Sequence, residues 1–269
     1  MTYAFPTGGL PKQSESPEST AIFTTAYACL PARTHRDIVT SLLPGWTKTR
    51  AWIFARPLSG FAETFAQYAI ELGRDGGSAS PEPDSNAQAI LFVADGHGRL
   101  TINQEQHDLR AGSYAYIPAS AQWTLWNTSD HLFKVHWIRK RWEPASGLTH
   151  PPVLVTHDDD HPPVAMPDTN GVWATTRFVD PNDMRHDCHV NIVTLQPGGR
   201  IPFAETHIME HGLYILQGTA DYLLNTDWVK VGPGDFLWLR AFCPQACIAT
   251  GQEPFRYLLY KDVNRHPKL

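Results

Sequence analysis

The sequence predicts an all-β protein made of two duplicated domains, and three observations support that prediction. The chain has 269 residues, which exceeds a common single-domain size, and its 22 prolines and 19 glycines are typical of many short strands joined by turns. Short apolar runs recur between these turn residues, whereas no amphipathic helix of three or more turns is evident. The two halves also repeat one order of elements.

The first domain is indicated by strand-like runs that begin after an arm rich in Pro, Ser, Gly and Thr. We assign residues 1–50 to this N-terminal arm and the first strands, and residues 51–147 to the first barrel-sized domain. The runs that predict its strands are residues 51–54, 64–72, 89–94, 100–103, 113–117, 122–126 and 132–138.

Residues 148–180 are predicted to link the domains, because prolines surround a polar run from His157 to His161. This run of histidines and aspartates invites a metal-site interpretation, but consecutive coil residues seldom converge on one ion, and a solvated loop is favoured. The second domain is predicted at residues 181–269. Its strand-like runs are residues 187–195, 212–216, 220–224, 235–239, 245–249 and 255–260.

Paired glycines give the clearest sign of duplication. Gly96 and Gly112 are 16 residues apart, and Gly218 and Gly234 have the same spacing. Each pair brackets one strand and the turn that leads to the next. Such a match indicates that the second half repeats the first.

Composition excludes several functional classes. The net charge of −5 and the lack of Lys/Arg runs argue against nucleic acid as a partner. Residues 1–13 lack a secretory leader pattern, and no segment approaches the ~20 apolar residues of a membrane span. We therefore expect a soluble, cytoplasmic protein that acts on a small molecule. The scattered cysteines (Cys29, Cys188, Cys243 and Cys247) are expected to be buried thiols.

Glu205, His207 and His211 form the most informative cluster. Glu205 and His207 are two residues apart, so on a strand their side chains share a face, which His211 also joins if the strand stays regular. Imidazole and carboxylate together suit borderline-to-hard divalent metals. Taken singly, each histidine is more often a structural, hydrogen-bonded residue, but the combination favours a metal site.

The spacing from Gly199 to Gly218 resembles the first motif of the cupin superfamily, with ligand types permuted. In the second cupin motif the fourth ligand follows a glycine by eleven residues, and that position after Gly234 is Gln245. The resemblance implies two tandem double-stranded β-helix (jelly-roll) barrels and one metal held by Glu205, His207, His211 and Gln245 in the second.

The first barrel breaks the same pattern. The places that correspond to the first three ligands fall near Pro83, Ser85 and Ala89, which are not a plausible ligand set. Gln122 lies near the fourth place, but alone it cannot hold an ion. We therefore expect a metal-free barrel with a packing role.

More specifically, the chain resembles the (S)-ureidoglycine aminohydrolase family. The resemblance rests on Glu205-Thr206-His207, His211-Gly212, residues 225–228 and the C-terminal run 257–265. It implies Mn²⁺-dependent hydrolysis of (S)-2-ureidoglycine to (S)-ureidoglycolate and ammonia in purine (allantoin) catabolism, with Fe²⁺ or another divalent metal as the alternative. It also implies that Tyr257 and Lys261 face the substrate.

The residue pattern agrees with these roles. Tyr257 and Lys261 alternate on one strand face, so both can aim at one pocket, where Lys261 can hold a carboxylate or transfer a proton. We predict Lys261, Tyr257 and Glu205 as catalytic. Predicted substrate contacts are Glu205, Gln245, Tyr257, Lys261, His189, Asn191 and Tyr222, although Tyr222 fits core packing equally well.

His189-Val190-Asn191 departs from the resemblance, because the family has Asn-X-His at this place. The exchange keeps both polar side chains on one face but alters the hydrogen bonds offered to a substrate. Another metal-dependent cupin enzyme, such as a dioxygenase or isomerase of a small carboxylate, therefore stays open. A non-enzymatic ligand sensor is a weaker alternative. A homo-oligomer is expected, because cupin barrels commonly pair through edge strands.

Overall fold

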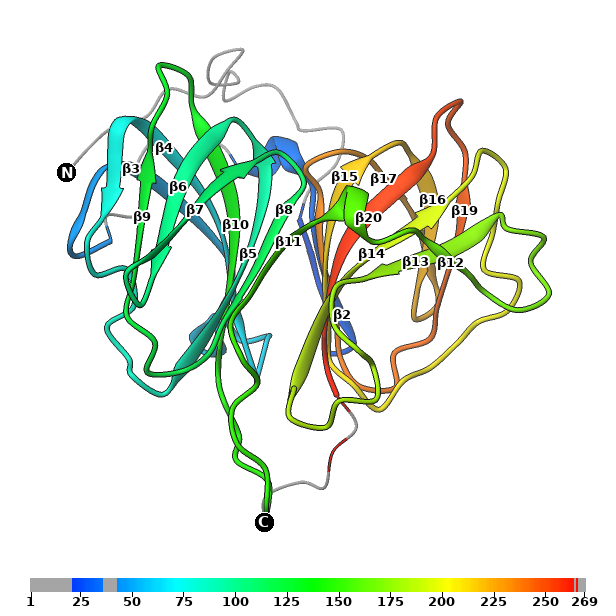
Figure 1. Ribbon diagram of the computed structural model, residues 1–269. Helices are drawn as coiled ribbons and strands as arrows, with labels where there is room; N and C mark the ends of the chain where they lie inside the picture. The colour runs from blue at the N-terminus through cyan, green and yellow to red at the C-terminus, as the bar shows by residue number, and fades with distance from the viewer. Residues whose placement is uncertain (1–20, 36–42, 264, 266–269) are drawn as a thin grey trace.

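The computed structural model describes residues 21–35, 43–263 and 265. They form two β-barrels side by side, as Figure 1 shows. The prediction of an all-β fold with two tandem barrels is confirmed. The described helical segments are short 3₁₀ turns, η1 (Ala32–Thr34), η2 (Pro57–Ser59) and η3 (Asp158–Asp160). No helix among the described residues is long and apolar enough to span a bilayer.

The first barrel is formed by a nine-stranded sheet with the order β11-β8-β5-β10-β4-β9-β6-β7, to which β3 adds by pairing with β4. All of the pairings are antiparallel. The strands are β3 (Trp46–Ala55), β4 (Ala66–Ser78), β5 (Ala87–Asp95), β6 (His97–Ile102), β7 (Glu105–Arg110), β8 (Ser113–Ile117), β9 (Trp123–Asn127), β10 (Phe133–Arg141) and β11 (Leu154–His157).

The second barrel is formed by an eight-stranded sheet, β1-β2-β18-β15-β20-β14-β13-β12, and a three-stranded sheet, β17-β16-β19. The eight are β1 (Ile22–Phe23), β2 (Tyr27–Leu30), β12 (Val164–Ala165), β13 (Trp173–Arg177), β14 (Cys188–Leu195), β15 (His211–Gln217), β18 (Phe236–Leu239) and β20 (Phe255–Asp262). The three are β16 (Ala220–Leu224), β17 (Asp227–Val231) and β19 (Gln245–Ala249).

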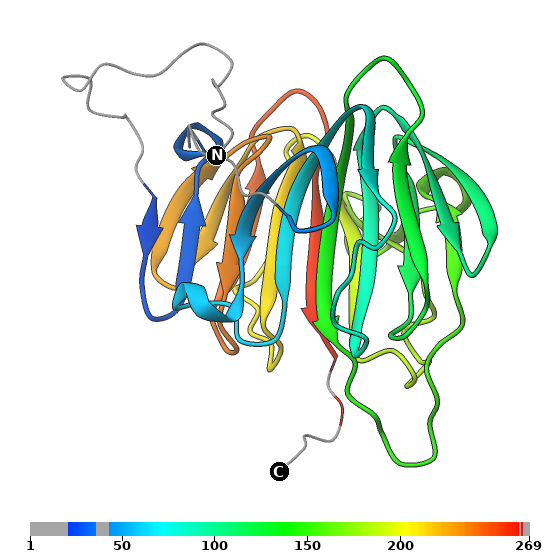
Figure 2. The ribbon, with the colours of Figure 1, turned by 90° about the vertical axis from the view of Figure 1, so that its left-hand side faces the viewer.

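The two barrels exchange segments. Strand β2 comes from the range assigned to the N-terminal arm and first strands, yet it pairs with β18 of the second barrel. Figure 2 shows these blue strands beside the orange and yellow strands of that barrel. Within the predicted linker 148–180, β11 pairs with β8 of the first barrel, whereas β12 and β13 join the second. The chain therefore crosses between the barrels twice.

The repeated glycines have a steric cause. Gly96 and Gly218 both have left-handed backbones, with φ of 81° and 72°. A Cβ at Gly96 would lie 2.3 Å from the carbonyl oxygen of Leu132, and one at Gly218 would lie 2.6 Å from that of Pro254. Each half thus makes a left-handed turn that packs closely against a backbone carbonyl oxygen. Only glycine, which has no Cβ, fits such a position.

Alternation along the strands separates three cores. In β20, Phe255 and Tyr257 point into the second barrel, while Leu258 and Tyr260 pack between the barrels. A third core fills the first barrel. Because the inter-barrel core contains large rings such as Phe65, Tyr260 and Trp238, the barrels form one extended apolar contact.

The inter-barrel core also buries an ion pair. Lys140 Nζ lies 2.8 Å from Asp187 Oδ2, and the two side chains are 4% and 2% exposed. Asp187 also accepts hydrogen bonds from Gln88 Nε2 at 2.5 Å and Glu143 N at 2.8 Å. These bonds join the start of β14, the strand that contains His189, to the first barrel.

Lys140→Met is expected to lower the free energy of unfolding by about 3 kcal/mol, because it leaves the Asp187 carboxylate buried without its countercharge. Chemical denaturation followed by tryptophan fluorescence measures this change. Lys134→Met is the matched control, since Lys134 forms an exposed pair with Asp95 at 3.5 Å and its loss should cost at most ~1 kcal/mol. Equal losses in the two variants would contradict the assignment of a stabilising buried pair.

Candidate active site

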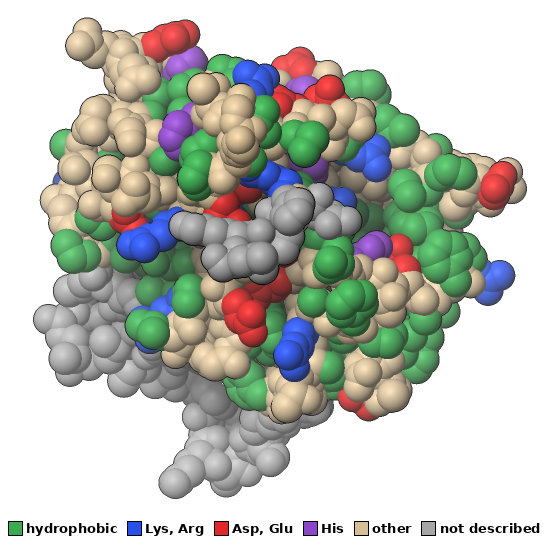
Figure 3. All heavy atoms as spheres, turned by 90° about the horizontal axis from the view of Figure 1, so that it is seen from below, with side chains coloured by type: hydrophobic (Ala, Val, Ile, Leu, Met, Phe, Trp, Pro, Cys, Tyr) green, Lys and Arg blue, Asp and Glu red, His purple; other side chains and the backbone are tan. Residues whose placement is uncertain are grey.

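Polar side chains gather at one end of the second barrel. The register of β15, β20 and β14 places His211, Lys261 and His189 in one row across three neighbouring strands. Leu213, Ile215 and Tyr257 follow on the same face and belong to the barrel core, so this row also points inward. The row lies where β20 ends near the C-terminus, the end seen from below in Figure 3, where charged and histidine side chains reach the surface.

Glu205 and His207 approach this row from an irregular segment. The expectation that both lie on a regular strand is wrong, because the described strand begins only at His211. Glu205 instead makes one isolated bridge with Gln245, with backbone hydrogen bonds of 2.9 Å in both directions. The carbonyl of His207 accepts a hydrogen bond from Phe242 N at 2.6 Å. These contacts hold the segment beside β19 without a continuous ladder.

The bridge brings the predicted ligands together. Glu205 Oε2 lies 3.4 Å from His207 Nε2, and the rings of His207 and His211 stack with centroids 5.1 Å apart. Gln245 is the bridge partner of Glu205 and its Oε1 accepts a hydrogen bond from Tyr222 at 3.1 Å. One carboxylate, two imidazoles and one amide oxygen therefore border the same space.

His211 is prepared to act as a neutral ligand. Its Nδ1 lies 3.0 Å from the carbonyl oxygen of Met209, which cannot donate, so Nδ1 carries the proton and Nε2 offers a lone pair. Burial, with the neighbouring His207, lowers the pKa of His211 to about 3. The donor set suits a divalent cation such as Mn²⁺ or Fe²⁺.

Two tyrosines form the floor of this space. Tyr222 and Tyr257 are buried, with ring centroids 6.1 Å apart in an edge-on contact. Burial raises the pKa of both phenols well above the ordinary value, so both stay protonated. The ring of Tyr222 packs in the core, as one of its two predicted roles requires, and its hydroxyl donates a hydrogen bond to Gln245.

Comparisons with known proteins agree with this architecture. A cupin-domain family model matches residues 71–139 and 191–260. A rice (Oryza sativa subsp. japonica) protein named as a probable (S)-ureidoglycine aminohydrolase is 32% identical over 85% of this chain and 71% of its own length. The (S)-ureidoglycine aminohydrolase of Escherichia coli K12 is 27% identical over 85% of this chain and 86% of its own.

This chain belongs to the (S)-ureidoglycine aminohydrolase family, a family of bicupins. A crystal structure of a Pseudomonas aeruginosa protein named for induction by glyoxylate is 55% identical. It superimposes with a TM-score of 0.91 and covers 100% of this chain and 98% of its own. Membership in a family named for aminohydrolases supports an enzyme, whereas it gives no support to a non-enzymatic sensor.

The residues exchanged relative to the family motif lie beside the ligands. His189 and Asn191 are both buried and share the inward face of β14. Burial and the nearby Lys261 lower the pKa of His189 to about 4, so it presents a neutral imidazole. His189 therefore lies in the row of Lys261, and Asn191 lies one row deeper in the barrel. The order in the family motif would place these two side chains the other way round.

Arg177 is an inward-facing residue near the candidate ligands that the sequence patterns did not single out. It pairs with Asn191 and follows Trp173 and Thr175 on the inward face of β13, where it is half-buried. Burial lowers the pKa of Lys261, and the positive charge of Arg177 lowers it further, while Glu205 opposes both. Alternation from the core residue Trp173 was the available signal, but it required the start of β13 to be known.

The first barrel carries different chemistry in the corresponding row. Arg139 of β10 is the counterpart of Lys261, since each lies 27 residues after its paired glycine, Gly112 or Gly234. Its strand neighbours are Ala66 and Ala89, neither of which can ligate a metal. Arg139 pairs with Glu82 and lies 5.1 Å from the Trp137 ring. Gln122 is exposed, and Trp123 faces the interior instead.

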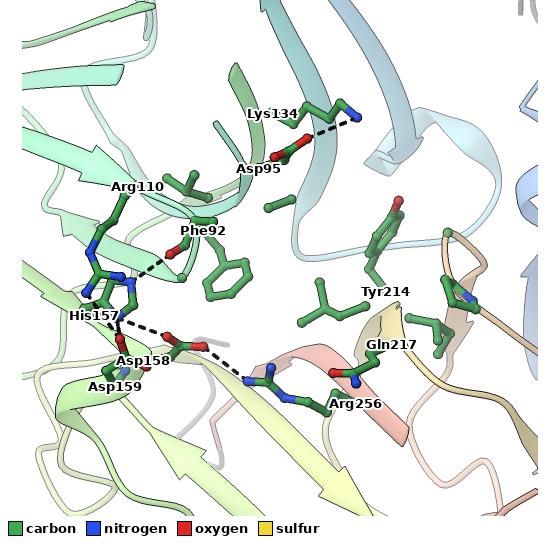
Figure 4. A pocket seen from close by; sticks show the side chains of 18 residues that line it. Phe92, Asp95, Arg110, Lys134, His157, Asp158, Asp159, Tyr214, Gln217 and Arg256 are labelled. Atoms are coloured by element: carbon green, nitrogen blue, oxygen red, sulfur yellow. Dashed lines mark hydrogen bonds and ion pairs between the residues drawn. The ribbon is translucent and has the colours of Figure 1, made fainter. Parts of the chain in front are cut away.

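Among the described residues, one group of three potential metal ligands has its ligand atoms within 4.8 Å of one another: His157, Asp158 and Asp159. The ligand atoms of Glu205, His207 and His211 are not grouped as closely. Both nitrogens of His157 are occupied, Nε2 by the Ala111 carbonyl at 2.7 Å and Nδ1 by Asp159 N at 3.1 Å. Figure 4 shows the carboxylates directed to arginines in a cleft of about 640 Å³ between the barrels.

Those ion pairs are 3.2 Å long, from Asp158 to Arg256 and from Asp159 to Arg110. A metal would have to displace both arginines and one histidine hydrogen bond. The cluster is therefore an anchor that ties η3 to both barrels, and the expectation of a solvated loop is wrong.

Proposed function

We propose that this protein hydrolyses (S)-2-ureidoglycine to (S)-ureidoglycolate and ammonia in a Mn²⁺-dependent reaction of allantoin catabolism. The observation that supports the proposal is that the predicted ligands, Glu205, His207, His211 and Gln245, lie at the same barrel end as Lys261. The reaction breaks the bond from the substrate α-carbon to its amine and forms a bond from that carbon to a water oxygen. One proton of that water leaves with the amine.

The donor set fits the metal that the family implies. Glu205, His207, His211 and Gln245 would hold it, and when bound the ion would polarise the substrate and neutralise negative charge. The neutral state of His211 and the free Nε2 that its Met209 hydrogen bond leaves are what such a ligand requires.

Lys261 and Arg177 would receive the substrate carboxylate. Their positive charges face the same inward surface, on strands separated by β14. The charge of Arg177 acts on Lys261, which is consistent with both cations facing one anionic group. Tyr257, which stays protonated, would donate a hydrogen bond. Lys261 would give a proton to the leaving amine and regain one from the attacking water, so that the water proton ends on ammonia.

Ammonia release from freshly generated ureidoglycine, by protein loaded with Mn²⁺, tests the proposed function. Release that persists without O₂ supports hydrolysis and excludes the alternative dioxygenase reaction. A metal-loaded, folded protein that releases no ammonia would overturn the substrate assignment. In that case the exchange of His189 and Asn191 is the first feature to reverse.

Arg177→Met is expected to raise KM by about 10- to 100-fold with little change in kcat, because a charge-assisted hydrogen bond is worth ~1.5–3 kcal/mol. Steady-state ammonia release measures both constants. Arg200→Met is the control, since Arg200 is an exposed arginine of the same barrel. A variant with unchanged KM would show that Arg177 does not contact the substrate.

A further inference from the structure

Glu210 is a buried carboxylate that the proposed chemistry does not use. It immediately precedes His211 and is 7% exposed. Its Oε1 accepts hydrogen bonds from Glu63 N and Trp238 Nε1, both at 2.6 Å. Its Oε2 accepts two from Thr64, from the backbone N at 2.9 Å and from Oγ1 at 2.6 Å. Three of these four donors belong to the segment that leads into the first barrel's β4.

The contact extends to β20 on both sides of Lys261, through residues 64 and 65 on one side and through Glu210 on the other. The Thr64 hydroxyl gives its proton to Glu210, so the Tyr260 hydroxyl, 3.0 Å away, donates to it. The ring of Phe65 stacks on that of Tyr260 with centroids 3.9 Å apart. On the other side, Asp262 Oδ1 accepts the backbone N–H of Glu210 at 2.6 Å. Both strand neighbours of Lys261 are therefore tied to this contact.

Gly212, the residue after His211, completes the contact. A Cβ at this position would lie 2.5 Å from Cζ of the Phe65 ring. Phe65 is itself fully buried, so the ring has little room to move away. The close approach of Phe65 therefore requires glycine beside His211, and the residues on both sides of this predicted ligand contact residues 63–65.

Gln88 makes a related contact on the other side of the interface between the barrels, but not next to a predicted metal ligand. Gln88 of the first barrel is the counterpart of Glu210, because each lies eight residues before its paired glycine, Gly96 or Gly218. Gln88 binds Asp187, and its Oε1 accepts from Tyr116 at 2.9 Å. Gln88 precedes Ala89, whereas Glu210 precedes a predicted ligand.

We propose that residues 63–65 of the first barrel are a positioning element that sets His211 and Lys261 in place for metal and substrate. This inference rests on the proposed function, because it assigns the first barrel a part in the metal site of the second. Fixing the backbone on both sides of His211 reduces the reorganisation needed when the ligands close on an ion.

Thr64→Val tests the inference, because it removes one hydroxyl and keeps the shape of the side chain. Isothermal titration of metal-free protein with Mn²⁺ should show a dissociation constant about tenfold higher than that of the wild type. Thr64→Ser, which keeps the hydroxyl, should stay within about twofold. Ser78→Ala is the control, since it removes a fully buried hydroxyl that bonds Gly45 O at 2.8 Å, away from this contact.

Circular dichroism establishes that each variant is folded. Glu210→Gln provides a second test, because its amide NH₂ group cannot accept the hydrogen bonds that one carboxylate oxygen of Glu210 accepts. Wild-type affinity in folded Thr64→Val and Glu210→Gln would overturn the inference while leaving the metal site standing. Equal weakening in Ser78→Ala would also overturn it, because general destabilisation would then be the cause. Wild-type protein that binds no Mn²⁺ would instead overturn the metal assignment, and the positioning role with it.

Discussion

Glu205→Ala is expected to abolish ammonia release and to weaken Mn²⁺ binding by more than about 100-fold. Residues that only orient a ligand typically cost about 10- to 100-fold in metal affinity, and a carboxylate that contacts the ion should cost more. Glu205 also lies 3.4 Å from His207, so its loss removes the charge that helps to hold that imidazole. Calorimetric titration with Mn²⁺ and the ammonia assay measure the two losses separately.

Glu253→Ala is the matched control for this experiment. Glu253 is an exposed carboxylate of the same barrel, and its contact is a 3.1 Å hydrogen bond from Gln217. Its removal should change neither metal affinity nor activity. If Glu205→Ala bound Mn²⁺ as tightly as Glu253→Ala, Glu205 would not be a ligand, and the permuted cupin motif would need another interpretation.

The sequence predicted the barrels because their repeated constraints are local. Gly96 and Gly218 each meet a carbonyl oxygen at the same place in the fold, so both halves kept a glycine there. Strand alternation was equally readable, and it correctly placed Tyr257 on the inward face. Features of this kind depend on a residue and its nearest strand neighbours, which the order of residues encodes directly.

Features that depend on distant segments were not readable. Strand β2 pairs with β18 across more than 200 residues, and nothing within residues 27–30 specifies that partner. Glu205 was expected on a regular strand because its two-residue spacing from His207 permits one, yet only its bridge to Gln245 forms. Arg177 was missed because its relevance arises from Asn191 on the neighbouring strand β14 and from Lys261 on β20, one strand further away.

The two barrels carry different residues in the corresponding row of side chains. In the first barrel the row that corresponds to His211, Lys261 and His189 contains Ala89, Arg139 and Ala66. Arg139 is held by Glu82 and by contact with the rings of Tyr68 and Trp137, which stabilises that end of the barrel. A positively charged side chain thus occupies the same place in both barrels. Arg139 contributes to packing in the first, and Lys261 belongs to the candidate active site in the second.

Lys261→Met is expected to lower kcat/KM by about 10³-fold while leaving the Mn²⁺ dissociation constant nearly unchanged, because the proposed role of Lys261 is to contact the substrate and not the metal. Lys230→Met serves as the control, since Lys230 is an exposed lysine of the same barrel and should retain full activity. Loss of Mn²⁺ binding in Lys261→Met would show that the residue supports the metal site rather than the substrate.

Lys261→Arg then separates the two roles that Lys261 can have. Arginine keeps the positive charge and can still bind a carboxylate, but it cannot give up a proton at accessible pH. If Lys261 only anchors the substrate, the arginine variant should restore KM and most of kcat. If it also moves a proton to the leaving amine, KM should recover while kcat stays about 100-fold low. Recovery of neither constant would indicate that the larger guanidinium does not fit between His189 and His211, its neighbours on β14 and β15.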